Sequence, residues 1–264
     1  MAENILKKII EKKKLRIGEL KKNVSLENLK EKINQCKSYL NFKDKIIRNN
    51  LNNKISIIAE IKKASPSAGI IIENYNPVEI AQKYYKSNVT CLSVLTEEDF
   101  FLGKLDHISD IKKKINLPIL CKDFFIDTFQ VYLAKSYGAD AILIILAGLN
   151  NDLANKIYLE ASKLNMSVIV EVHTLEEAFR ALNFKNALIG INNRNLKTLK
   201  TNINTTYDIY EVLKNHNEPL ISESGIQTRE EILEIENKTK IKTFLIGESL
   251  LKNFDQNSIL SLLE

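Results

Sequence analysis

Two lysines and two glutamates, Lys62, Lys122, Glu60 and Glu171, stand at or just beyond the ends of short apolar runs. Such a lysine is not freely solvated, and burial together with a nearby cation would lower its pKa. It could then donate a proton or attack a carbonyl group. The glutamates would stay ionised among the lysines and could orient a lysine or remove a proton. The alternative for each residue is a structural ion pair, but several together favour catalysis.

Other polar groups at run ends suit anion binding. Asn192 and Arg194 stand two apart, so strand alternation would aim both at one face, and the Arg fork matches a carboxylate or phosphate. A surface salt bridge is the alternative for Arg194. Gly225 and Gly247 follow the last two apolar runs, where barrels often bind phosphate through backbone N–H groups. The polar segment 62–69 is expected to be a loop that could close as a lid.

These groups need elements that bring them to one place, and the sequence offers eight strand candidates. They lie near 55–60, 89–95, 118–122, 141–146, 168–172, 187–191, 219–222 and 243–246. Nearly continuous apolar runs are typical of strands buried on both faces of a parallel sheet. A helix candidate follows each, which leaves a barrel or a doubly wound sheet. The first run lacks a G-x-G-x-x-G sequence, which weakens the dinucleotide-binding sheet. We predict the α/β class and a (β/α)8 TIM barrel, with the polar groups at its catalytic mouth.

Helix boundaries support this alternation. Asn76-Pro77 predicts the start of a helix over 78–87, and Asp127 the cap of one over 128–137 that stops at Gly138. Thr174 with Glu177, and Thr228 with Glu231, have capping-box spacing.

The first 50 residues differ from the rest and predict an N-terminal helical extension. Ile5, Leu6, Ile9 and Ile10 have helical spacing among lysines, and a second helix is expected from Ser25 to about Leu40. A basic arm for RNA or a membrane is the alternative to packing on the barrel with the lysines in water, which we favour. We expect residues 1–264 to form one domain.

Bulk composition narrows the function classes. The length of 264 residues suits one barrel, and the net charge of +5 comes with interleaved Lys and Glu, typical of a solvated surface. Three scattered cysteines argue against disulfides or a cysteine zinc site and indicate a reducing cytoplasm. We expect neither a signal peptide nor a membrane span, and find no convincing metal-ligand spacing. His107 and His216 are expected at the surface, and His173 as a bystander beside the mouth.

Seven strings carry a resemblance to a known family. They are Ile58-Ala-Glu-Ile-Lys-Lys-Ala-Ser-Pro-Ser67, Ser93-Val-Leu-Thr96 with Phe101-Leu-Gly103, Lys122-Asp-Phe124 with Asp127, Val170-Glu-Val-His173, Gly190-Ile-Asn-Asn-Arg-Asn-Leu196, Ser222-Glu-Ser-Gly-Ile226 and Leu245-Ile-Gly-Glu248. From about residue 3 to the end, the sequence resembles indole-3-glycerol phosphate synthase of tryptophan biosynthesis. The length leaves no room for the isomerase domain sometimes fused to this enzyme, which implies a monofunctional protein.

The resemblance implies a reaction and roles for these residues. The family closes the ring of 1-(2-carboxyphenylamino)-1-deoxyribulose 5-phosphate to indole-3-glycerol phosphate, losing carbon dioxide and water without metal or organic cofactor. By resemblance Lys122 is the general acid at the ketone and Glu171 the general base in dehydration. Lys62, steered by Glu60, helps bind the substrate anions and is a further candidate for proton transfer.

By the same resemblance, further residues hold the substrate. Ser65, Asn192 and Arg194 position the anthranilate part, Phe101, Phe124 and Leu143 line its aromatic pocket, Ser224, Gly225, Gly247 and the backbone at Glu248 hold the phosphate, and Glu223 joins the binding set. The implied protein is a cytoplasmic monomer that binds no nucleic acid or membrane and could associate with other enzymes of tryptophan biosynthesis.

Four alternatives remain open. A Schiff-base lyase or aldolase would use Lys62 or Lys122 as nucleophile. Phosphoribosylanthranilate isomerase would be expected to use a Cys–Asp pair, and no suitable pair is evident. An RNA-binding protein would use the N-terminal lysines in a salt-dependent way. A degenerate barrel is disfavoured by the intact acid, base and phosphate strings.

Overall fold

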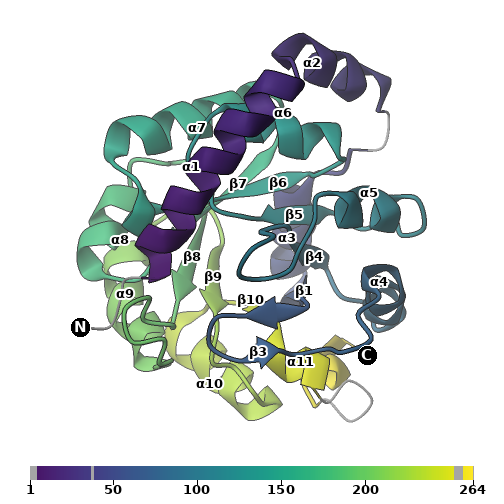
Figure 1. The fold of residues 1–264 in the computed structure, drawn as a ribbon. Coiled ribbons are helices and arrows are strands. Elements are labelled where there is room, and N and C mark those ends of the chain that lie inside the picture. Colours follow the sequence, from purple (N-terminus) through teal and green to yellow (C-terminus); the bar gives the residue numbers. More distant parts are fainter. Residues whose placement is uncertain (1–4, 37–38, 253–257, 264) are drawn as a thin grey trace.

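Eight parallel strands of the described chain close into a barrel (Figure 1). The computed structural model describes residues 5–36, 39–252 and 258–263. The barrel strands are β1 (Ser56–Ile61), β4 (Cys91–Leu95), β5 (Ile119–Lys122), β6 (Ala141–Ile145), β7 (Ser167–Val172), β8 (Leu188–Asn192), β9 (Leu220–Glu223) and β10 (Thr243–Ile246). Strand β1 pairs with both β4 and β10, which closes the ring. The predicted (β/α)8 barrel is therefore confirmed.

A helix follows each barrel strand, as the alternation predicted. These helices are α4 (Pro77–Lys86), α5 (Asp106–Lys112), α6 (Phe129–Ser136), α7 (Asn151–Lys163), α8 (Leu175–Ala181), α9 (Asn204–Leu213), α10 (Arg229–Thr239) and α11 (Glu248–Lys252). Short 3-10 helices, η1 (Leu146–Gly148) and η3 (Leu260–Leu263), add to them. No helix in the described segments combines the length and apolar character that a membrane crossing requires.

The predicted helix caps are only partly right. Thr228 and Glu231 form the complete capping box at α10. At α8, Thr174 accepts a hydrogen bond from the backbone of Glu177, but the Glu177 carboxylate accepts from the backbone N–H of His173 instead of that of Thr174. The second box is therefore only half formed.

The N-terminal extension contains three helices, where the sequence predicted two. Helix α1 spans Ile5–Asn23, α2 spans Leu26–Gln35 and α3 spans Phe42–Leu51. The second predicted helix was thus too long, and residues 37–38 of its predicted span lie outside the described residues. Asn41 starts α3 by accepting a hydrogen bond from the backbone of Asp44.

Helix α3 closes the N-terminal end of the barrel. Phe42 and Ile46 are fully buried and pack against inward-facing strand residues such as Ile58 and Leu120. The backbone N–H of Lys43 donates to Ser167 Oγ at the start of β7 (3.1 Å). Among the described residues, α3 therefore covers the N-terminal end of the barrel interior.

Helix α1 lies at the opposite end and runs across the barrel in front of the strands (Figure 1). The buried Lys13 ammonium lies 2.6 Å from Asp123 Oδ1, directly after β5. Leu6 and Ile9 are also buried, and Ile17 packs with Leu29 of α2 and Phe129 of α6. The extension therefore covers both ends of the barrel, with α1 over the mouth and α3 beneath it.

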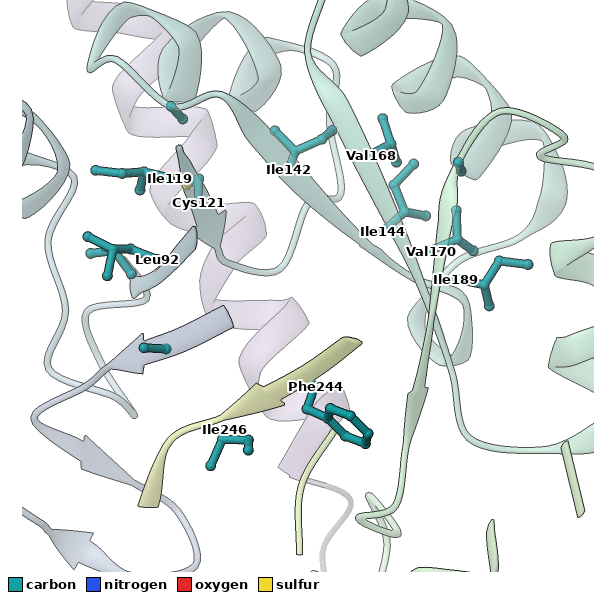
Figure 2. Close-up of a cluster of buried hydrophobic side chains, with 14 of the residues drawn as sticks. Leu92, Ile119, Cys121, Ile142, Ile144, Val168, Val170, Ile189, Phe244 and Ile246 are labelled. Atoms are coloured by element: carbon teal, nitrogen blue, oxygen red, sulfur yellow. The ribbon is translucent and has the colours of Figure 1, made fainter. Parts of the chain in front are cut away.

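Strand residues alternate between two apolar clusters. Outward-facing side chains, including Leu92, Ile144, Val170 and Phe244, pack against the surrounding helices (Figure 2). Inward-facing residues such as Leu143 form the smaller cluster inside the barrel. Because side chains alternate with a period of two, the residue two places after an inward apolar residue also points inward.

The segment after β1 contains a small hairpin that the sequence did not predict. Strands β2 (Ala64–Ser65) and β3 (Gly69–Ile70) pair antiparallel across Ser65 and Gly69, whose φ of +67° suits glycine. The predicted loop over 62–69 is therefore partly ordered by backbone pairing.

Candidate active site

One cavity of about 720 Å³ at the mouth collects every predicted site residue. Its lining includes Glu60, Lys62, Ser65, Phe101, Lys122, Phe124, Leu143, Glu171, Asn192, Arg194, Glu223, Ser224, Gly225, Gly247 and Glu248. The volume lies within the range usual for small-molecule sites. All predicted site residues thus line one cavity, together with residues that the sequence did not predict.

Strand alternation explains how the polar groups reach this cavity. Glu60 follows the inward-facing Ile58 by two positions, and Lys122 follows Leu120 in the same way. Glu171 follows Ile169, and Glu223 follows Ile221. The inward row of each of these strands is therefore apolar at depth and charged at its carboxyl end, where the rows meet the cavity.

Lys122 is held between two carboxylates. Its ammonium donates to Glu171 Oε2 at 2.8 Å and to Glu223 Oε2 at 2.9 Å. Burial lowers the pKa of Lys122, but the charges of Glu171, Glu223 and Glu60 outweigh burial and raise it above its usual range. The sequence-based expectation of a lowered pKa was wrong, because the carboxylates gather around the ammonium more closely than any cation.

Glu171 contacts cations at both oxygens. Lys122 lies at Oε2, and His173 Nε2 lies 3.1 Å from Oε1. Burial raises the pKa of Glu171, but Lys122 and His173 together hold it well below its usual range. His173, predicted to be a bystander beside the mouth, lies outside the cavity lining, and its nearly buried ring touches the candidate base.

Glu223 is the second carboxylate that Lys122 contacts, and its pKa shifts in the direction opposite to that of Glu171. Burial and the nearby charge of Glu171 raise its pKa, although Lys122 opposes the shift. Its Oε1 is buried and has no hydrogen-bond partner among the residues that the structure describes, and a Cβ at Gly190 would collide with that oxygen. Gly190 therefore leaves the space that Glu223 occupies, a role that sequence reasoning did not assign.

Lys62 forms a second, separate pair. Its ammonium lies 2.7 Å from Glu60 Oε1, and both side chains are largely buried. A Cβ on Gly247 would collide with Glu60 Oε1 and would lie 3.1 Å from Lys62 Nζ. The sequence assigned Gly247 to phosphate binding, and the structure adds that its bare backbone makes room for this ion pair.

Arg194 joins the loops on two sides of the mouth. Its guanidinium donates to Ser67 Oγ (3.1 Å), in the turn between β2 and β3, and to the backbone carbonyl of Leu199 (3.0 Å). Asn192 Oδ1 accepts from the backbone N–H of Arg194 (3.0 Å). Both side chains therefore face the cavity, as the spacing predicted.

The cavity has an aromatic and apolar wall. The rings of Phe101 and Phe124 lie 6.2 Å apart, and Leu143 lines the floor. Ile5, Leu6 and Ile9 of α1 also line the cavity, which the sequence did not predict. The helical spacing of these residues was visible in the sequence, but it could not show that the helix lies over the barrel mouth.

The last two barrel loops form the other end of the cavity. Ser224 and Gly225 have consecutive positive φ values of 68° and 80°. Consecutive turns of this kind can direct backbone N–H groups toward an anion. Lys252 also lines this end, 2.6 Å from Glu248 Oε1, so the Glu248 carboxylate is neutralised beside the candidate anion site.

No group of three or more potential ligands among the described residues is arranged to hold a metal ion. The cavity instead offers fixed ammonium and carboxylate groups beside an aromatic wall. Such a site can donate and accept protons and bind an anionic, ring-bearing molecule.

The sequence comparisons agree with this arrangement. The sequence model of the family "Indole-3-glycerol phosphate synthase" matches residues 6–263. The chain is 44% identical over 261 residues to the indole-3-glycerol phosphate synthase of Prochlorococcus marinus subsp. pastoris, covering 96% of this chain and 87% of that protein. It is 37% identical to the enzyme of that name from Carboxydothermus hydrogenoformans, covering 98% of each.

Solved structures resemble the chain at the level of fold. The tryptophan synthase alpha chain of Legionella pneumophila subsp. pneumophila gives a TM-score of 0.61 at 12% identity, over 85% of this chain and 93% of that one. The 3-keto-L-gulonate-6-phosphate decarboxylase of Vibrio cholerae gives 0.59 at 18% identity, over 80% and 95%. Both likenesses support the barrel alone.

Proposed function

The chain belongs to the indole-3-glycerol phosphate synthase family of enzymes, and from that premise we propose which of its side chains perform the reaction. The substrate is 1-(2-carboxyphenylamino)-1-deoxyribulose 5-phosphate, with a carboxylated aromatic ring at one end, a phosphate at the other and a ketone between. The observation that carries the proposal is the position of the Lys122 ammonium between Glu171 and Glu223.

Lys122 acts as the general acid in ring closure. The aromatic carbon that bears the carboxylate attacks the ketone carbon, and the carbonyl oxygen takes a proton from Lys122. An ammonium with a raised pKa is a weak acid toward a ketone, but it can protonate the oxygen as negative charge develops there. The bond to the carboxylate then breaks, and its electron pair restores the aromatic ring as carbon dioxide leaves.

Glu171 acts as the general base in dehydration. It removes a proton from the closed ring as the new hydroxyl leaves. That hydroxyl takes a second proton, for which Lys62 is the candidate donor, and departs as water. The 2.8 Å contact between Glu171 and Lys122 gives the removed proton a direct path back to the neutral amine. One proton is consumed overall, because loss of carbon dioxide replaces a carboxylate.

The two ends of the cavity suit the two ends of the substrate. Phe101, Phe124 and Leu143 surround the aromatic ring, while Arg194 and Ser65 bind its carboxylate. The phosphate lies against the backbone of Ser224 and Gly225, with Lys252 and Lys62 as nearby cations. Both anions are then held while the ketone lies over Lys122.

The test is a fluorescence assay that follows indole formation from this substrate, with a chelator present. We expect product from the wild type, and a loss of turnover of about 10²-fold or more in Lys122→Ala and in Glu171→Gln. The exposed Lys156→Ala is the matched control and should keep full turnover. Near-normal turnover in either active-site variant would reject the role of that residue.

A Schiff-base lyase is the alternative that the same lysines could serve. It requires a neutral amine, and the carboxylates around Lys122 favour its charged form. Borohydride added with substrate would trap a covalent adduct in that case. We expect no adduct, and its appearance on Lys122 or Lys62 would overturn the acid–base assignment.

A further inference from the structure

Behind the candidate base lies a line of alternating charges that extends out of the cavity. Lys122 contacts Glu171, Glu171 contacts His173, and His173 contacts Glu177. His173 Nδ1 lies 3.2 Å from Glu177 Oε2 in a hydrogen bond. His173 Nε2 lies 3.1 Å from Glu171 Oε1 as a charge contact without hydrogen-bond geometry, and makes no hydrogen bond with any described residue. The ring thus stands between a cavity residue and a residue of α8.

The position of the ring is fixed from behind. Glu177 Oε2 also accepts the backbone N–H of His173 at 2.7 Å, and the Glu177 backbone is bonded to Thr174 at the start of α8. The His173 side chain is 6% exposed, and that of Glu171 is 3% exposed. These contacts are therefore largely shielded from bulk solvent, and the bond to Glu177 restrains the ring.

The charged residues that touch His173, and those that line the hollow beside it, are acidic. Glu171 of β7 and Glu177 of α8 touch the ring, and Asp208 and Glu211 of α9 line the same surface hollow. No lysine or arginine lines that hollow among the described residues. Burial lowers the pKa of His173, but Glu171 and Glu177 raise it to about 9.

We propose that His173, held by Glu177, is a positioning residue for Glu171: an imidazolium that fixes one oxygen of the base while Lys122 holds the other. The proposal deepens the proposed function and rests on Glu171 being the base. Its mechanistic value follows from the reaction. When Lys122 gives up its proton, Glu171 loses that neighbouring positive charge, and His173 remains as the cation that keeps the buried carboxylate ionised.

The sign of the pH dependence follows from the raised pKa. His173 is charged in the folded enzyme up to about pH 9, whereas a solvated histidine loses its charge near pH 6.5. The charge supports Glu171 through neutral pH and disappears as pH rises through 9. The support for catalysis is therefore lost around pH 9, and the contribution of this contact to stability is lost between about 6.5 and 9; neither is lost on acidification.

The experiment compares kcat–pH profiles of the wild type, His173→Gln and Glu177→Gln, beside a titration of the imidazole by NMR. We expect His173→Gln to lower kcat about 10-fold with little change in KM, and to remove an alkaline limb near pH 9. Glu177→Gln keeps the imidazole, so it should move that limb to lower pH by roughly one unit or more.

His216→Gln is the matched control, because His216 Nε2 contacts only the backbone carbonyl of Ala187 and lies outside the cavity lining. Its profile should match that of the wild type. A His173 pKa at or below 6.5 by NMR, or an alkaline limb unmoved by Glu177→Gln, would overturn the proposal; both readings remain available if His173→Gln fails to fold. If Glu171→Gln keeps full turnover, the proposed function fails instead, and this result separates the two.

Discussion

At the scale of single residues, the site depends on buried side chains of opposite charge that neutralise one another. Lys122 and Glu171 each lie in surroundings whose burial alone would neutralise them. Each stays charged because partners of opposite charge lie within 3.1 Å of it. Removing one member therefore changes the protonation of the others, and effects of substitution in this cluster should not be additive.

Gly190 offers a test of the cluster that removes no charge. In Gly190→Ala the new methyl group would displace the Glu223 carboxylate from Lys122. We expect turnover to fall by roughly 10- to 10²-fold while the barrel still folds, since misplaced groups cost rate before stability. Steady-state kinetics and a thermal melt measure both.

Gly18→Ala is the control for Gly190→Ala, because a Cβ at Gly18 meets nothing within 4 Å. A Gly190→Ala enzyme with wild-type turnover would show that Glu223 can move aside freely. The double variant Gly190→Ala, Glu223→Ala should be no slower than Glu223→Ala alone if the methyl group acts through Glu223.

Sequence reasoning identified the charged residues but not their charge states. Strand ends and a period of two were enough to place Lys122 and Glu171 at one mouth. The pKa of Lys122 depends on which carboxylates lie across the barrel, and Glu223 is distant in sequence. The contacts of His173 could not be predicted for the same reason, since one of its two carboxylate partners, Glu177, lies on the next helix.

At the scale of elements, α1 is attached to the barrel mouth by a buried ion pair. Lys13 and Asp123 are 7% and 9% exposed at the side chain, and Asp123 Oδ2 also accepts from Thr96 Oγ1 at 2.7 Å. In Lys13→Met the Asp123 carboxylate stays buried without its cation. We expect a loss of about 3–5 kcal/mol in the free energy of unfolding, measured by denaturant titration.

The exposed Lys14→Met, on the same helix, is the control for Lys13→Met and should lie within about 0.5 kcal/mol of the wild type. Adding Asp123→Asn should recover part of the loss, because it removes the uncompensated charge. A Lys13→Met protein as stable as the wild type would mean that α1 leaves the mouth easily.

The elements that the sequence did not predict, α3, β2 and β3, contain too few apolar or alternating residues to form a distinctive pattern. Helix α3 has few turns, and its apolar residues Phe42 and Ile46 resemble any amphipathic pair. Strands β2 and β3 contain two residues each, too few for any alternation to be visible. The barrel strands were predicted well because each is apolar on both faces.

At the scale of the whole molecule, the extension and the barrel share their cores. Helix α3 contributes to the cluster inside the barrel, and α1 contributes to the wall of the cavity. We therefore propose that residues 1–264 behave as one domain and unfold in one cooperative transition. Calorimetry and circular dichroism should give the same midpoint, as should loss of activity. A separate early transition would indicate an extension that unfolds on its own.

The fold could be predicted from sequence further than the site could. Repetition of strand and helix restricts the topology to few choices, and each repeat adds evidence for the same one. A site has no such redundancy. The contact between His173 and Glu171, or the space at Gly190, rests on single distances that no pattern in the chain repeats.

The place of α1 has a consequence for how the chain is made. Lys21 of α1 pairs with Asp127, which lies 106 positions later in the chain. At a synthesis rate of about 5–20 residues per second, the helix leaves the ribosome roughly 5–20 s before its docking surface is synthesised. During that interval Leu6 and Ile9 lack the barrel mouth that buries them in the folded protein. The charged lysines around these residues would then keep the uncovered helix soluble until the rest of the barrel is synthesised.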